Sequence, residues 1–129
     1  MSLYMKSTDY IRFDNERLTL SEKEMKELKN EISDFLGMYP IIKSINYKYT
    51  SYGLKHAFER IMGFYISNMD FKEAMRQLGI PNDHTKDQGK CTGLNVSYPI
   101  SKNFITMAHR KAGARELRAI KDMILQESK

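Results

Sequence analysis

Four segments of this chain carry apolar residues at intervals of three and four positions, and a serine stands at the start of each segment. This spacing gathers apolar side chains on one face of an α-helix. A serine at a helix start accepts a hydrogen bond from a backbone N–H that has no partner within the helix. The sequence therefore predicts a mainly α domain of four to five helices, which begin at Ser21, Ser51, Ser67 and Ser101.

Two of these helix starts carry a second signal, an acidic residue three positions after the serine. Ser21 with Glu24 and Ser67 with Asp70 have this capping-box spacing, in which the paired residues satisfy free backbone N–H groups reciprocally. Glycine adopts the left-handed conformation that ends many helices, and Pro40 bars continuation of the first one. We expect helix ends at Gly37, Gly63 and Gly79, and an end or interruption at Gly113.

The remaining segments predict a small β-element within a single domain of residues 1–129. Residues 94–98 alternate like a short strand, and residues 40–49 are predicted to be extended or irregular. Residues 82–93 are mostly polar, which indicates a loop. Residues 1–20 are predicted to form an edge strand or a loose arm.

The sequence lacks the signals of a membrane protein and of an enzyme. No run approaches roughly 18 consecutive apolar residues, and the N-terminus has no signal-peptide core, so we expect a cytoplasmic protein without a membrane partner. Cys91 is the only cysteine, which excludes an internal disulfide and a thiolate metal site. His56 and Glu59 are one helical turn apart, as a structural contact or as half of an acid–base pair. Because no P-loop or other catalytic motif is present, we predict no enzymatic activity, no metal and no cofactor.

Basic charge is concentrated in the C-terminal two thirds of the chain. Residues 1–40 contain six Lys/Arg and eight Asp/Glu, a net charge of 6 − 8 = −2. Residues 41–129 contain fifteen and eight, a net charge of 15 − 8 = +7. Such a distribution is typical of a surface that faces phosphates, and also of a soluble protein with ordinary lysine-rich faces.

Residues 51–98 predict a helix-turn-helix or winged-helix-like unit, because two helices with a short glycine-containing link precede a loop and a strand. The second helix would read base edges, and the polar loop would serve as a wing along the phosphate backbone. The alternative is an amphipathic helix with ordinary solvated charges. The side chains expected to contact nucleic acid from this unit are Lys55, Asn68, Lys72, Arg76, Lys86 and Lys90.

Residues 101–127 predict a C-terminal basic helix or helix pair. Lys111, Arg115 and Arg118 share one helical face through spacings of four and three. This face would grip a phosphate backbone or an acidic protein surface, and the alternative is a set of cations that stabilise the helix C-terminus. The whole cluster comprises Lys102, Arg110, Lys111, Arg115, Arg118 and Lys121.

Part of the chain, residues 46–98, resembles a group of short uncharacterised proteins carried by bacterial phages and integrative mobile elements. The resemblance lies in Thr50-Ser51-Tyr52-Gly53-Leu54-Lys55-His56, in Tyr65-Ile66-Ser67-Asn68, and in Phe71, Ala74, Met75 and Gly79. It implies a mobile-element context and no particular activity. Packing alone does not explain four polar or aromatic residues of this segment, so we expect any functional surface there at Tyr52, Lys55, His56 and Asn68.

The favoured function from sequence is nucleic-acid binding, with duplex DNA as the ligand, by a regulator or accessory protein of a phage or mobile element. One alternative is an anti-defence protein that inhibits a host nucleic-acid-processing nuclease, because residues 21–36 carry five carboxylates against three lysines. The other is a homodimeric interaction module, because an apolar stripe of Leu117, Ile120 and Ile124 could pair with its copy.

Overall fold

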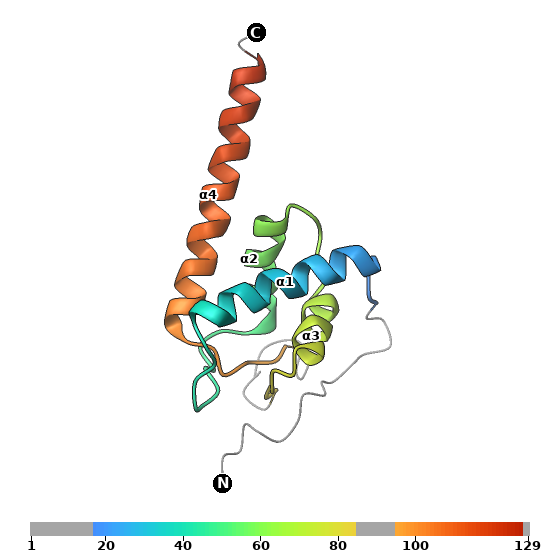
Figure 1. Cartoon of the computed structure of the whole chain (residues 1–129), viewed down its shortest axis with the longest axis vertical. Helices are drawn as coiled ribbons and strands as arrows, with labels where there is room; N and C mark the ends of the chain where they lie inside the picture. Colours follow the sequence, from blue (N-terminus) through green and yellow to red (C-terminus); the bar gives the residue numbers. More distant parts are fainter. Residues whose placement is uncertain (1–16, 85–94, 128–129) are drawn as a thin grey trace.

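Four helices make up most of the described chain, which comprises residues 17–84 and 95–127 of a computed structural model (Figure 1). Their bounds are α1 Glu22–Met38, α2 Ser51–Met62, α3 Asn68–Gln77 and α4 Lys102–Glu127. Within the described ranges, β-pairing is limited to two isolated antiparallel bridges, Asn46 with Tyr98 and Asp83 with Ser97. The prediction of a mainly α domain is confirmed.

Both predicted capping boxes are present. At the start of α1, the Glu24 N–H donates to Ser21 Oγ over 3.1 Å, and the Ser21 N–H donates to Glu24 Oε1 over 2.9 Å. At the start of α3, the Asp70 N–H donates to Ser67 Oγ over 3.0 Å, and the Ser67 N–H returns a 2.9 Å bond to Asp70 Oδ2. Two helix starts are thus fixed by residues within one turn of each other.

The glycines end helices only where the backbone becomes left-handed. Gly63 ends α2 with φ 82°, and Gly79 follows α3 with φ 77°, as predicted. Gly37 instead lies inside α1, which ends at Met38, and the C-cap residue Tyr39 stands immediately before Pro40. Gly113 lies inside α4, so the predicted interruption there is wrong and the basic segment is one helix of 26 residues.

Ser51 does not cap α2 as predicted. The N-cap residue is Thr50, whose side chain makes no capping hydrogen bond, and Ser51 is the first helical residue. Ser51 is fully buried, its N–H donates to the Val96 carbonyl over 2.7 Å, and its Oγ accepts from the Val96 N–H over 3.2 Å. The serine therefore joins the start of α2 to a segment 45 positions away.

Residues 95–100 form an extended segment rather than a strand of a sheet. We call this segment the thread. On one side, the Tyr98 carbonyl accepts from the Asn46 N–H over 2.9 Å. On the other side, Asp83 and Ser97 exchange backbone bonds of 3.0 and 2.8 Å. The thread is buried from Val96 to Ile100, so its backbone polar groups need these partners.

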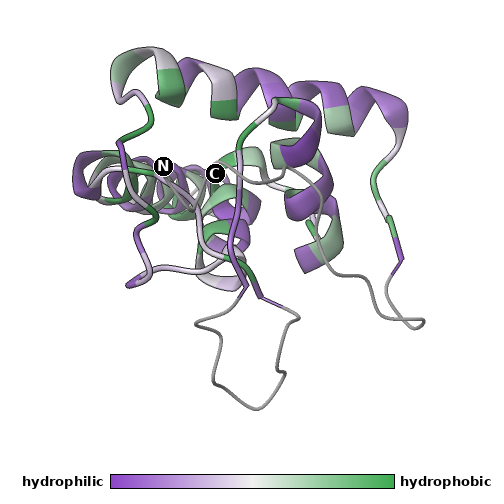
Figure 2. Cartoon of the chain, turned by 90° about the horizontal axis from the view of Figure 1, so that it is seen from below, coloured by the Kyte–Doolittle hydropathy of each residue, from purple (hydrophilic) through white to green (hydrophobic). Residues whose placement is uncertain are grey.

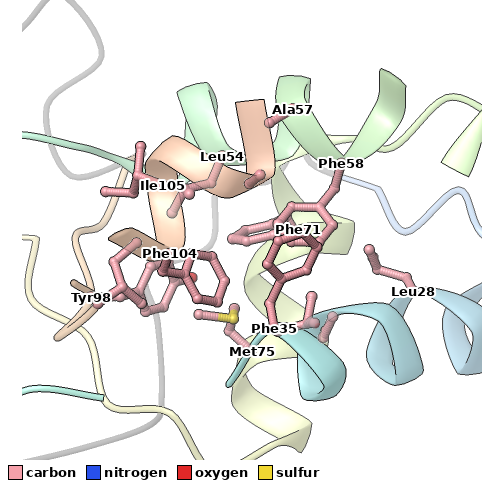
Figure 3. Close-up of a cluster of buried hydrophobic side chains, with 14 of the residues drawn as sticks. Leu28, Phe35, Leu54, Ala57, Phe58, Phe71, Met75, Tyr98, Phe104 and Ile105 are labelled. Atoms are coloured by element: carbon pink, nitrogen blue, oxygen red, sulfur yellow. The ribbon is translucent and has the colours of Figure 1, made fainter. Parts of the chain in front are cut away.

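The hydrophobic core lies where the four helices meet the thread (Figure 3). Phe58 of α2 is fully buried and stands at its centre. Its ring lies 5.6 Å from that of Phe35, 5.7 Å from that of Phe71 and 6.2 Å from that of Phe104, centroid to centroid. One aromatic side chain thus joins α1, α3 and α4 to α2.

The helices α1 and α4 differ in how much of their length packs against the core. Viewed along the long axis of the molecule, hydrophobic and hydrophilic stretches alternate along the α1 ribbon, as its apolar periodicity predicts (Figure 2). The N-terminal half of α4 also packs into the core, where Phe104, Ile105, Ala108 and Ala112 are buried. The C-terminal half of α4 projects past the other three helices (Figure 1), and its side chains are exposed from Ala114 to Gln126.

Candidate functional site

The predicted reading face of α3 does not form as an exposed basic surface. Lys72, expected to contact phosphate, is 1% exposed and belongs to the largest fully buried side chains. The prediction of Lys72 as a surface cation is therefore wrong.

The other two residues of that face are held by polar neighbours. The Asn68 Nδ2 group donates to Asn95 Oδ1 over 3.1 Å. Arg76 is exposed and forms a bidentate pair with Glu73, with bonds of 2.9 Å from Nε and 2.7 Å from one terminal nitrogen. Because Glu73 compensates the charge of Arg76, this face of α3 has little attraction for phosphate.

The remaining candidates of the helix-turn-helix unit divide into two groups. Lys86, Lys90 and Cys91 lie outside the described residues. Lys55 is described and is 6% exposed, so its side chain is buried in this structure, and its contact with nucleic acid stays a prediction.

Lys55 is instead the centre of a cluster on the outer side of α2. Its Nζ donates to Glu59 Oε1 over 2.7 Å, one turn along the helix. The same nitrogen lies 5.4 Å from the ring centroid of Tyr52 and 5.1 Å from that of Tyr65. Both tyrosines are exposed and shield the ammonium group between them, and cation–π attraction compensates part of its lost hydration.

His56 completes this cluster. Its Nδ1 lies 3.3 Å from Glu59 Oε2, and its ring meets the Tyr52 ring edge to face at 4.5 Å between centroids. The predicted contact between His56 and Glu59 is confirmed. Glu59 also accepts from the backbone N–H of Ile66 over 3.4 Å, which ties the cluster to the α2–α3 link. The sequence pointed to Tyr52, Lys55 and His56, and it missed Tyr65 because that residue lies beyond the end of α2.

Five exposed cations of α4 lie on one side of the helix. At about 100° per residue, five basic side chains fall within an arc of about 140° on the helix surface. All five are exposed. They are Arg110, Lys111, Arg115, Arg118 and Lys121. We call this set the basic face of α4.

Most of the basic face keeps its charge uncompensated. Lys111 pairs with Glu31 of α1, whereas no carboxylate in residues 17–84 or 95–126 forms an ion pair with the other four cations. Asp122 lies on the same arc, near the C-terminal end. The excess of cations over carboxylates therefore remains along most of the face.

Glu116, another acid of α4, lies outside the basic face and is engaged elsewhere. Arg60 of α2 grips its carboxylate with two nitrogens, one of them at 3.1 Å from Oε2. This hydrogen bond lowers the pKa of Glu116 and raises that of Arg60. The ion pair holds α4 against α2. Because Arg60 neutralises the Glu116 carboxylate, this negative charge does not weaken the attraction of the basic face for phosphate.

Comparison with known protein families, with curated proteins and with solved structures finds no match for this chain. No helix in the described part of the chain has the length and apolar composition needed to cross a membrane. The described residues also contain no group of three or more His, Cys, Asp or Glu side chains placed to hold a metal ion.

Proposed function

We propose that the protein binds nucleic acid and that the basic face of α4 contacts the phosphate backbone. The observation that carries this proposal is the alignment of Arg110, Arg115, Arg118 and Lys121 on one exposed arc without carboxylate partners in the described ranges. Arginine and lysine side chains that neutralise phosphates release condensed counterions, which supplies sequence-independent affinity. The contacts are expected to position the protein rather than to read bases.

Within this proposal, α2 and α3 would act as a helix-turn-helix unit, but α3 is not the main contact. Its Lys72 is buried and its Arg76 is paired with Glu73. Exposed aromatic rings of Tyr52 and Tyr65 on the Lys55 cluster offer stacking surfaces that suit unpaired bases. The resemblance of residues 46–98 to proteins of phages and integrative elements suggests a regulator or accessory protein of such an element.

The test is fluorescence anisotropy with a labelled duplex of about 20 base pairs and a single strand of equal length, across about 50 to 300 mM salt. If four cations contact phosphates, log Kobs against log salt should fall with a slope of about −3 to −4. Arg115→Gln with Arg118→Gln should reduce that slope by about 2. Comparison of the two probes shows whether the exposed tyrosines favour unpaired bases.

The matched control is Lys23→Gln with Lys26→Gln, which removes the same charge from exposed positions of α1. This variant should bind as the wild type does. Absence of binding to either probe at about 50 mM salt, where electrostatic binding is strong, would overturn the proposal. Equal loss in both double variants would show attraction by net charge alone and would also reject a defined α4 interface.

A further inference from the structure

The projecting half of α4 exposes a row of large apolar side chains. Leu117 is 54% exposed, Ile120 is 53% exposed and Ile124 is 57% exposed. Their spacings of three and four place them within an arc of about 60°. A row of large exposed apolar side chains marks an interaction surface, while Met123 and Leu125 of the same arm, 61% and 62% exposed, lie outside this row. We call these three residues the apolar stripe.

The apolar stripe has the register of a coiled coil. Leu117 and Ile124 occupy a positions and Ile120 the d position between them. In the same register Glu116 occupies a g position, and Lys121 occupies the e position that follows it. Toward the body this register meets Gly113 and Arg110, so the seam is confined to the projecting half.

The rest of the molecule leaves the stripe accessible. The buried residues of α4, Phe104 to Ala112, face the body in a direction about 130° around the helix from the stripe. The basic face lies about 120° from the stripe on the opposite side. A helix can therefore pack along the stripe without displacing the body, and of the cations on the basic face only Lys121 borders the stripe.

We propose that the apolar stripe pairs with the same stripe of a second copy, as a short parallel pair of helices. In this arrangement Glu116 of one copy faces Lys121 of the other, and the two-fold symmetry produces the pair twice. Glu116 retains 48% side-chain exposure while bound to Arg60, and a carboxylate accepts several hydrogen bonds, so it can bind both cations. This inference does not depend on nucleic-acid binding.

The charges select a parallel over an antiparallel pair. With the helices reversed and the stripes in register, the centre of the interface falls between Ile120 and Lys121. The Lys121 side chains of the two copies would then lie near each other, and Glu116 would have no opposing cation. Like charges at this position would oppose association, whereas the parallel arrangement pairs opposite charges.

Sedimentation velocity of the full chain, loaded from about 10 to about 500 µM, tests association over the range expected for a short seam. The wild type should shift from monomer to dimer as concentration rises. Ile120→Glu should be monomeric throughout, while Ala119→Glu, the same change at an exposed position outside the seam, should dimerise as the wild type does. Circular dichroism should show both variants folded, because neither residue belongs to the core. A wild type that stays monomeric at the highest loading would overturn the proposal.

Exchange of the charges at Glu116 and Lys121 tests the parallel arrangement of the two helices. Glu116→Lys and Lys121→Glu should each weaken self-association at least tenfold, since each places like charges across the seam. An equimolar mixture of the two variants should form a heterodimer, because every cross-seam pair is again opposite in sign. Dimerisation of either single variant at wild-type strength, or failure of the mixture to associate, would reject the parallel pairing.

A cross-link separates the parallel dimer from other dimers. In a Cys91→Ser background, Ile124→Cys places symmetric thiols at facing a positions of a parallel seam, within reach of a disulfide. Leu125→Cys, one position away and outside the seam, is the control. Oxidation should cross-link the first variant and not the second. Equal cross-linking of both would contradict the proposed register.

Discussion

Thr19 binds the carboxylate of Asp70 across 51 positions of the chain, through its backbone N–H at 2.8 Å and through its hydroxyl. Leu20 adds a third donor, a backbone N–H at 3.3 Å. The same carboxylate accepts from the Ser67 N–H in the α3 capping box. Asp70 is fully buried, so one side chain both starts α3 and attaches the segment before α1 to it.

Replacement of Asp70 by alanine should lower the free energy of unfolding by about 3 kcal/mol. The substitution removes a helix cap and leaves several backbone donors of Thr19, Leu20 and Ser67 without their acceptor. Urea denaturation followed by circular dichroism measures the change. Glu24→Ala is the control, because Glu24 has the equivalent place in the exposed α1 box, and should cost about 1 kcal/mol or less. Equal losses in the two variants would contradict the role of Asp70 in attaching residues 17–20.

Two glycine substitutions should have opposite signs. A Cβ at Gly113 would meet nothing within 4 Å, so Gly113→Ala should stabilise the fold by about 0.5–1 kcal/mol through higher helix propensity. Gly63 has φ 82°, and Gly63→Ala should destabilise by about 1–2 kcal/mol because alanine is strained there. Thermal unfolding of both variants against the wild type checks the pair. A stabilising Gly63→Ala, or a destabilising Gly113→Ala, would show that the helix bounds are misplaced.

Ser51→Ala should cost about 2 kcal/mol, since it leaves the N–H of Val96 without its side-chain acceptor in a buried site. Thr50→Ala should stay within about 0.5 kcal/mol of the wild type, because the Thr50 side chain makes no capping hydrogen bond. Chemical denaturation of the two variants gives the comparison. A larger loss for Thr50→Ala would mean that Thr50 caps α2 after all.

Tyr47 should make the fold sensitive to alkaline pH. Its phenol donates to Asp83, and this hydrogen bond, with burial and the adjacent negative charge, raises its pKa from 10.0 to about 12. Because the folded-state pKa is the higher one, the neutral phenol stabilises the fold fully below about pH 10, and this contribution is lost as pH rises through about 12. Solvent screening of this exposed pair limits the contribution to about 1 kcal/mol.

Spectrophotometric titration of tyrosinate in the wild type, minus that in Tyr47→Phe, isolates the pKa of this residue. Asp83→Asn should return the value toward 10.0, since it removes the negative charge. Tyr47→Phe should also remove the stability loss between about pH 10 and 12. A difference titration centred near 10.0 would contradict the hydrogen bond to Asp83.

Helix starts and ends were predictable where the signal is local. The boxes at Ser21 and Ser67 involve residues within one turn, and the left-handed glycine at position 63 concerns only its own backbone. The role of Ser51 was not predictable, because its partner Val96 is remote in sequence and a serine at the first helical position gives the same pattern as a cap. The continuity of α4 through Gly113 was predictable only in part. A glycine favours an interruption, but its cost of about 1 kcal/mol is too small to break a long helix that is anchored in the core.

The candidate site was predictable as a set of charges but not as a surface. The expected reading face of α3 failed because remote segments cover the helix. Lys72 is 1% exposed, and Asn68 is bonded to Asn95, a residue 27 positions away. The sequence pattern of α3 shows one apolar face and gives no sign of a second covered side. The basic face of α4 was predictable as a surface because helical spacing alone aligns its five side chains, and all five are exposed.

The unbroken passage of α4 from the core to Glu127 also makes this helix a lever. Its anchored end is set by Ala112 in the core and by the brace between Arg60 and Glu116. The free arm beyond this brace, from Leu117 to Glu127, is about 15 Å long at 1.5 Å per residue. A tilt of about 10° at the anchored end would therefore move the tip by about 3 Å. A fluorophore at Gln126 would convert small changes of packing around Phe58 into displacements large enough to measure by energy transfer.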